Sequence, residues 1–169
     1  MRTEKLARGA LTLAVITISF MLFRGSTSLL NSIIVPLALY IILYDFTPGE
    51  FLTTFIAGLF LVALFFGTQI FFMMIYGLLA FLLLVLAQKG IFLRMGLLSS
   101  GVVISFIIAI HLTDLILGTA IQQALTSLAG GSQAGFYLLV SGEGILAGVV
   151  LAFTSSRLED RLAEIYSPD

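Results

Sequence analysis

Hydrophobic residues fill long stretches of this chain, and short segments with glycine or polar residues separate them. A helix needs about 20 apolar residues to cross a bilayer, because each residue rises 1.5 Å. Measured in this way, the pattern predicts six membrane-spanning helices, near Leu6–Phe23, Leu29–Tyr44, Phe51–Phe66, Ile70–Ala87, Leu97–Leu117 and Phe136–Thr154. The sequence therefore predicts an all-α integral membrane protein with a single six-helix domain.

The third and fourth predicted helices are separated only by Gly67, Thr68 and Gln69. One helix running from Phe51 to Ala87 is too long for a bilayer. We therefore expect a tight turn at these three residues.

The first apolar stretch follows three basic residues, as it does in a signal peptide. No small-residue cleavage site comes after it, and further apolar stretches follow directly. We interpret it as a retained helix.

Lysine and arginine residues concentrate on one side of the predicted bundle. Only Arg24, in the connection Arg24–Ser28, falls on the other side, which places both termini in the cytoplasm and the protein in the cell membrane. Residues 155–169 then form a cytoplasmic tail. The basic residues on the cytoplasmic side are Arg2, Lys5, Arg8, Lys89, Arg94, Arg157 and Arg161.

Composition supports the membrane class and narrows the function. Hydrophobic residues make up 60% and charged residues 10% of the 169 positions, and the mean hydropathy is +1.17. Soluble domains average about 25% charged residues. A net charge of −1 without a basic patch argues against nucleic-acid binding. There is no cysteine, nucleotide-binding loop or hydrolase motif, so we expect neither an enzyme nor a bound cofactor.

Three ionisable residues, His111, Asp114 and Glu143, lie inside apolar stretches. Charged groups at membrane depth are costly, so they usually face a bundle interior and have a function. His111 and Asp114 are one helical turn apart, and Glu143 has about the depth of His111 in the next predicted helix. If these helices are neighbours, the three side chains can converge in one externally open pocket. They can bind a small polar ligand, hold a divalent cation, carry a proton or neutralise one another.

The long connection Gly118–Gly135 follows these residues and has no charge. Residues 119–128 can form a short helix, with Gly130 and Gly131 as a hinge, or the segment is an inert outer loop. Three further polar residues near the pocket can supplement it or be ordinary interface residues: Gln122, Gln123 and Tyr137.

Small residues also recur at helical spacing. Ala7, Ala10 and Ala14 share one face of the first predicted helix, and Gly144 and Gly148 are spaced likewise in the last. Such residues allow close helix contacts in membranes, either within the bundle or with a partner.

Six short predicted helices, cytoplasmic termini and the Ala10-x-x-x-Ala14 stripe together resemble the substrate-binding S-components of energy-coupling-factor (ECF) vitamin transporters. The resemblance implies an S-component-like bundle whose alanine stripe docks onto a transmembrane coupling subunit driven by two ATPases. It also places His111, Asp114 and Glu143 in the half that binds the small-molecule ligand.

The apolar hairpin Ile56–Lys89 looks like a part of either the S-components or a second family. The second family is the rod-shape-determining MreD proteins, which are membrane scaffolds of cell-wall elongation. The chain is thus expected to be the substrate-capturing subunit of a multi-component importer, for example of a vitamin. The alternative is a non-transporting scaffold that recruits other membrane proteins.

Overall fold

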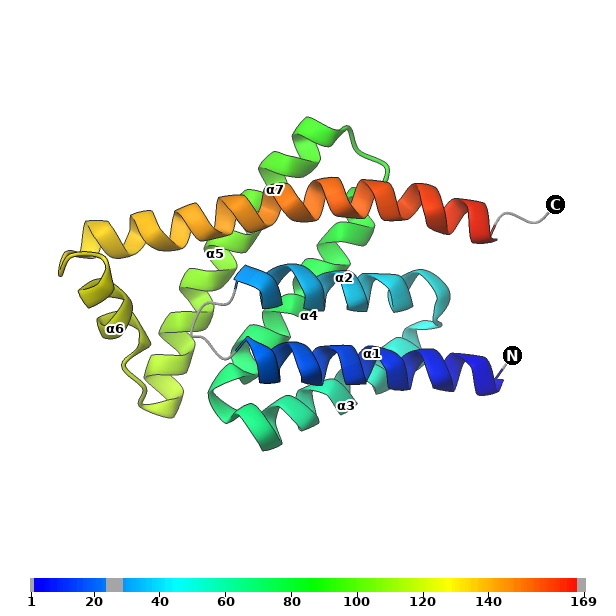
Figure 1. Cartoon of the computed structure of the whole chain (residues 1–169), viewed down its shortest axis with the longest axis horizontal. Coiled ribbons are helices and arrows are strands. Elements are labelled where there is room, and N and C mark those ends of the chain that lie inside the picture. The colour runs from blue at the N-terminus through cyan, green and yellow to red at the C-terminus, as the bar shows by residue number, and fades with distance from the viewer. Residues whose placement is uncertain (1, 24–28, 167–169) are drawn as a thin grey trace.

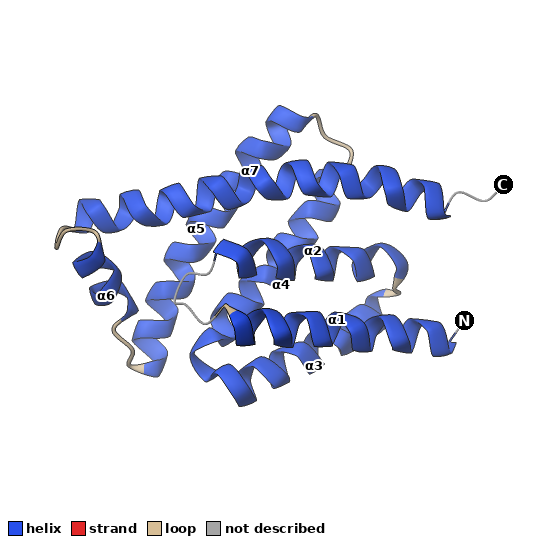
Figure 2. Cartoon of the chain, viewed as in Figure 1, coloured by secondary structure: helices blue, strands red, loops and turns tan. Residues whose placement is uncertain are grey.

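A computed structural model describes the backbone of residues 2–23 and 29–166 and the side chains of residues 3–23 and 29–161. The predicted connection Arg24–Ser28 and the last three tail residues lie outside the described part. Helices make up nearly all of it, with short connections between them (Figure 2). In chain order they are α1 (Arg2–Leu22), α2 (Leu29–Asp45), α3 (Pro48–Phe66), the 3-10 helix η1 (Gly67–Gln69), α4 (Ile70–Leu86), α5 (Ile91–Leu117), α6 (Ile121–Leu128) and α7 (Gln133–Tyr166).

Four helical stretches of the described chain are long and apolar enough to cross a membrane: Thr3–Leu22, Pro48–Leu86, Ile91–Leu117 and Gln133–Arg161. The apolar helix α2, with 17 residues, is shorter. η1 divides the stretch Pro48–Leu86 into α3 and α4, at the three residues where the sequence predicts a tight turn. The structure thus has the all-helical character expected, and six crossings of a bilayer stay a prediction.

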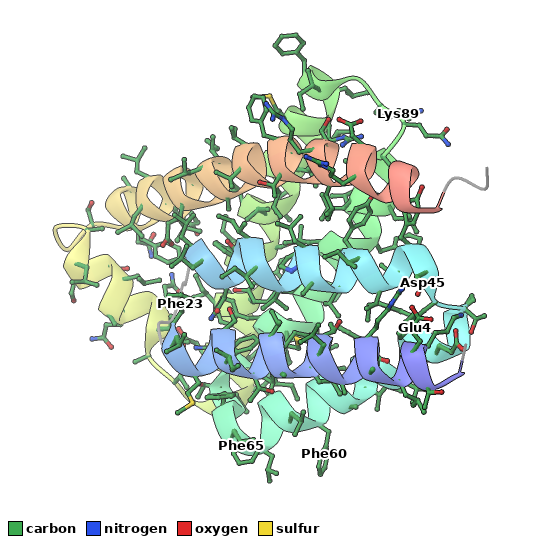
Figure 3. All side chains as sticks on the ribbon, turned by 45° about the vertical axis from the view of Figure 1, so that its right-hand side comes forward. Glu4, Phe23, Asp45, Phe60, Phe65 and Lys89 are labelled. Atoms are coloured by element: carbon green, nitrogen blue, oxygen red, sulfur yellow. The ribbon has the colours of Figure 1, made fainter. Side chains whose placement is uncertain are left out.

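The surface of the bundle is apolar where a soluble protein would be polar. Phe60 and Phe65 point outward from α3 with 66% and 63% of their surface exposed (Figure 3). Polar side chains such as Ser19, Asn31 and Thr113 are instead buried. Large apolar side chains on the outside fit contact with lipid, since soluble monomers rarely expose wide apolar patches.

The long helices pack around an aromatic-rich core. α1, α2 and α7 lie beside one another in Figure 1, with α1 against α2 and α2 against α7, and α4 and α5 cross behind them. The side chains of Tyr40, Tyr76, Phe72, Phe106 and Phe136 are fully buried in this core. The beginning of α1 and the end of α7 lie at the same end of the molecule, and α6 lies at the other end (Figure 1).

The end where α1 begins, called the charged end below, is closed by ion pairs between helices. Lys5 bonds to Glu50 at 3.0 Å, and Arg8 bonds to Asp45 at 2.8 Å. Glu50 also completes a capping box with Thr47, and this box defines where α3 begins. Glu4, Asp45 and Lys89 mark this end in Figure 3.

The largest interface in the bundle joins α5 and α7. A Cβ atom at Gly144 would lie 2.6 Å from Cγ2 of Val103, and a Cβ atom at Gly148 would collide with the Ser99 backbone. The glycine pair of α7 therefore serves contact within the bundle. These glycines let α5 and α7 approach more closely than any other residue type would permit.

Candidate functional site

A short helix forms within the long polar connection. α6 spans Ile121–Leu128, and the residues that bend the chain around it, Gly118, Gly130 and Gly131, have φ angles of 64°, 83° and 78°. These angles lie in the left-handed region, which glycine adopts without strain. The structure thus has the short helix that the sequence allowed, with bends at the glycines, and the role of Gly130 and Gly131 as a hinge stays a prediction.

Asp114 holds the start of α6. One carboxylate oxygen, Oδ1, accepts hydrogen bonds from the Thr119 hydroxyl and, at 2.8 Å, from the backbone N–H of Ile121. The other, Oδ2, accepts a bond from the backbone N–H of Gln122 at 2.8 Å. A carboxylate at a helix N-terminus satisfies N–H groups that have no partner within the helix and interacts favourably with the helix dipole.

A hollow of about 510 Å³ opens beside Asp114 and α6, called the α6 hollow below. Its walls carry amide and hydroxyl groups, and the carboxylate of Asp114 is the only charged group among the side chains that line it. The lining residues are Asp114, Thr119, Ala120, Gln122, Gln123, Thr126, Ser127, Gly131 and Gln133.

Three of the predicted ligand residues, Asp114, Gln122 and Gln123, thus line one hollow, and three do not. His111 is exposed, and its Nδ1 lies 2.7 Å from the backbone oxygen of Ile107 in its own helix. Tyr137 is 43% exposed. Its ring packs edge-on against Phe136, with the ring centroids 5.1 Å apart.

Glu143, the third predicted residue outside the hollow, is half-buried in α7 and interacts electrostatically with the fully buried Tyr76 of α4. α5 and α7 are neighbours as expected, but Glu143 does not line the α6 hollow with Asp114. Within the described residues, no three histidine, aspartate or glutamate side chains are grouped to hold a metal ion. Of His111, Asp114 and Glu143, only Asp114 therefore lines the α6 hollow, because depth does not fix the direction in which each helix face points.

The alanine stripe lies on the outside of the bundle. Ala7, Ala10 and Ala14 are all exposed. Ala10 also lines a groove of about 450 Å³ between α1 and α3, together with Leu13 and Ala57. Unlike the glycine pair of α7, the stripe is not used for packing within the described bundle.

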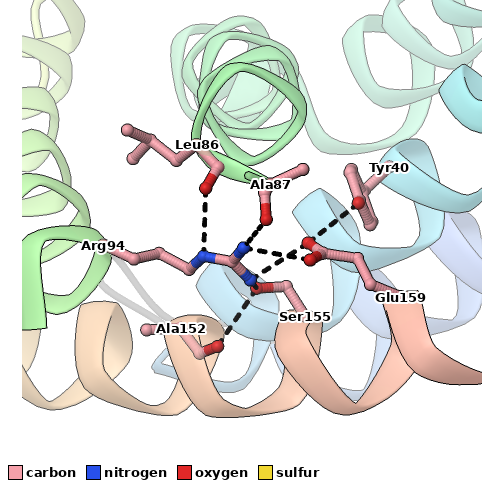
Figure 4. Close-up of polar contacts among 7 residues, drawn as sticks. All are labelled: Tyr40, Leu86, Ala87, Arg94, Ala152, Ser155 and Glu159. Atoms are coloured by element: carbon pink, nitrogen blue, oxygen red, sulfur yellow. Dashed lines mark hydrogen bonds and ion pairs between the residues drawn. The ribbon is translucent and has the colours of Figure 1, made fainter. Parts of the chain in front are cut away.

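A second polar cluster lies near the charged end, centred on Arg94 (Figure 4). The Arg94 side chain is only 3% exposed and forms a bidentate ion pair with Glu159 of α7, with N–O distances of 3.0 and 2.9 Å. It also donates to the backbone oxygens of Leu86, at 3.2 Å, and Ala87, where α4 ends. Tyr40 of α2 donates to the same Glu159 at 3.0 Å. The group is called the Arg94 cluster below.

The Arg94 cluster was not predicted from the sequence. There, Arg94 serves only as one of the basic residues that indicate the cytoplasmic side of the bundle. The signal that the sequence offers is that Arg94 lies in an apolar stretch, directly after Phe92 and Leu93 and before Met95. A buried charge requires a partner of opposite charge. Glu159 is 65 residues away in the sequence, so only the packing of α5 against α7 identifies it.

Comparison with known protein families, with curated proteins and with solved structures finds no match to this chain.

The chemistry of the α6 hollow follows from its lining. Amides and hydroxyls donate and accept hydrogen bonds, and the negative charge of Asp114 disfavours an anion. The hollow is suited to a small polar molecule that is neutral or positively charged.

Proposed function

We propose that this protein is the substrate-capturing membrane subunit of a multi-component importer, and that the α6 hollow receives the imported molecule. The observation that carries the proposal is the polar α6 hollow itself, at the end of the bundle opposite the charged end. Because basic residues favour the cytoplasmic side, this hollow faces the outside of the cell. A substrate then reaches it without crossing the bilayer.

The lining supports a particular substrate class. Gln122, Gln123 and Gln133 supply amide groups, and both oxygens of Asp114 already accept hydrogen bonds from α6 or the residues before it. The amides and hydroxyls therefore make most of the contacts, and the carboxylate contributes its charge. A small hydrogen-bonding molecule, neutral or cationic, fits this arrangement better than a carboxylate or phosphate compound.

Import also requires a source of energy, and the sequence has no nucleotide-binding loop. The proposed partners are a transmembrane coupling subunit and its ATPases. The exposed face with Ala7, Ala10 and Ala14 supports a contact with the coupling subunit, because small side chains let a second helix approach closely within lipid. This arrangement agrees with the resemblance to ECF S-components.

Binding is tested by heating the detergent-purified protein with a panel of small neutral, cationic and anionic metabolites. A ligand present at 100 times its Kd stabilises the folded state by about 2.7 kcal/mol. Native mass spectrometry of gently purified protein supplies candidates for the panel. Gln122→Leu should weaken binding by about 1–3 kcal/mol, the effect expected for a lost buried hydrogen bond.

Gln88→Leu is the matched control, because Gln88 is an exposed glutamine in the connection between α4 and α5, outside the α6 hollow. Equal loss of binding in both variants, or stabilisation only by anions, would contradict the proposed site.

A membrane scaffold of the MreD kind is the second candidate, and the exposed alanine stripe favours it equally, since that face suits any partner helix. The two functions differ in what stabilises the protein. A scaffold gains thermal stability only from a protein partner, and a capturing subunit gains it from one small molecule.

A further inference from the structure

α5 and α7 form the closest helix pair of the bundle and are joined in three places. Near their middle, Gly144 and Gly148 of α7 contact Val103 and Ser99 of α5 so closely that no Cβ atom fits between them. Such close backbone contact resists sliding, because packed helices have few alternative arrangements. α7 can therefore tilt about this contact but not slide, so a displacement of α7 at one end is accompanied by a displacement at the other.

Near the charged end, the same two helices are joined by the Arg94 cluster. Arg94 belongs to α5 and Glu159 to α7, and the pair also bonds to Tyr40 of α2 and to the last backbone oxygens of α4 (Figure 4). Four helices thus meet at one buried ion pair. A buried polar network is strongly favourable when complete and unfavourable when a partner is missing, so the loss of one partner would weaken this junction strongly.

At the opposite end, α6 joins the two helices. Asp114 of α5 holds the start of α6, and Gly130 and Gly131 lead from its end into α7. The α6 hollow is lined from both sides, by Asp114 of α5 and Gln133 of α7. A change in the position of α7 relative to α5 must therefore change the shape of the hollow.

From these three junctions we infer that the Arg94 cluster is a conformational latch that sets the shape of the α6 hollow. With the Arg94–Glu159 pair closed, α7 is fixed against α5 and the hollow keeps one shape; with the pair open, α7 moves and the hollow loses it. The inference rests on the proposed function only in that the hollow is the ligand site. An opened latch should weaken ligand binding by about 5- to 150-fold, the range of typical coupling between two sites.

The test uses pairs of spin labels, which this chain accepts cleanly because it has no cysteine. One pair, on Gln88→Cys and Arg157→Cys, reports the latch end, and a second, on Gln123→Cys and Leu138→Cys, reports the hollow end; all four positions are exposed. Distances within each pair are measured by double electron–electron resonance without ligand. A result on ligand binding therefore decides the proposed function separately.

Glu159→Gln, which removes the charge, opens the latch. The distance distributions of both pairs should broaden or shift in this variant. Asp160→Asn removes the same charge from the exposed neighbouring residue and should change neither pair.

Since Glu159→Gln leaves Arg94 buried without its ion pair, the double variant R94M/E159M is measured as well; replacing both partners with apolar residues commonly preserves the fold. It should also change both pairs. A change confined to the latch end would overturn the coupling to the hollow, and no change at either end would overturn the latch.

Discussion

Replacing Gly148 with alanine should separate α5 from α7. The new Cβ atom would collide with the backbone of Ser99, which cannot rotate away as a side chain can. Overpacking of this kind costs about 1–3 kcal/mol. Alanine also favours the helix by about 1 kcal/mol over glycine, so the comparison requires a control with the same gain.

Gly142→Ala supplies that control. Gly142 lies in the same helix, is exposed, and has no atom within 4 Å of the position of a new Cβ. Both variants gain the same helix propensity, so their difference isolates the contact with α5. For a chain of this length, 1–3 kcal/mol corresponds to about 2–12 °C in Tm.

The assay is the fraction of each detergent-purified variant that elutes as a monodisperse peak after heating for a fixed time. Identical heating times allow comparison even where unfolding is irreversible. Gly142→Ala should melt at or above the temperature of the unsubstituted chain, and Gly148→Ala below it. If the two variants melt together, α5 and α7 do not approach at Gly148, and the reasoning about this interface is refuted.

Three further predictions address the α1 face, the start of α6 and the topology. The double substitution Ala10→Leu and Ala14→Leu should leave the Tm of the isolated protein within about 1 °C, because both residues are exposed. It should abolish co-purification of the proposed coupling subunit. A large fall in Tm would instead show that the stripe packs inside the bundle. Asp114→Ala removes the hydrogen bonds that hold the start of α6 and should destabilise that helix by about 0.5–2 kcal/mol. Proteolysis near Gly130 should then be about 2- to 30-fold faster. Unchanged cleavage would contradict the capping role. A reporter active only in the cytoplasm should give signal when fused after Asp169 and none when inserted between Gly130 and Gly131, and signal at both places would contradict the predicted orientation.

Features that depend on neighbouring residues were predictable from the sequence. Most ends of the predicted helices agree with the structure within a few residues, and the break at Gly67–Gln69 is η1. Two ends were wrong, because α5 already begins at Ile91 rather than Leu97 and α7 continues to Tyr166 rather than ending at Thr154. The glycines after residues 119–128 likewise indicated the bend that follows α6. In each case hydropathy or backbone freedom acts locally, so pattern and structure agree.

Features that depend on the packing of distant helices were not predictable. Depth along a helix places His111 and Glu143 at one level, but His111 is exposed, whereas Glu143 is half-buried and interacts electrostatically with Tyr76. The role of Asp114 also differs from a conventional cap, since it reaches forward to backbone N–H groups seven and eight residues later. Only the fold of the whole connection brings those groups to it.

The length of α7 shapes the charged end of the molecule. Its 34 residues extend over about 51 Å, whereas the hydrocarbon core of a bilayer is about 30 Å thick. The connections from α2 to α3 and from α4 to α5 at the charged end have only a few residues each, so in the described chain the end of α7 and the beginning of α1 reach beyond them (Figure 1). In the proposed orientation, a soluble protein approaching from the cytoplasm meets the beginning of α1 and the end of α7 first. α7 is the longer of these two helices, so its end is a suitable attachment site for an antibody fragment or fusion partner that enlarges the protein for electron cryomicroscopy.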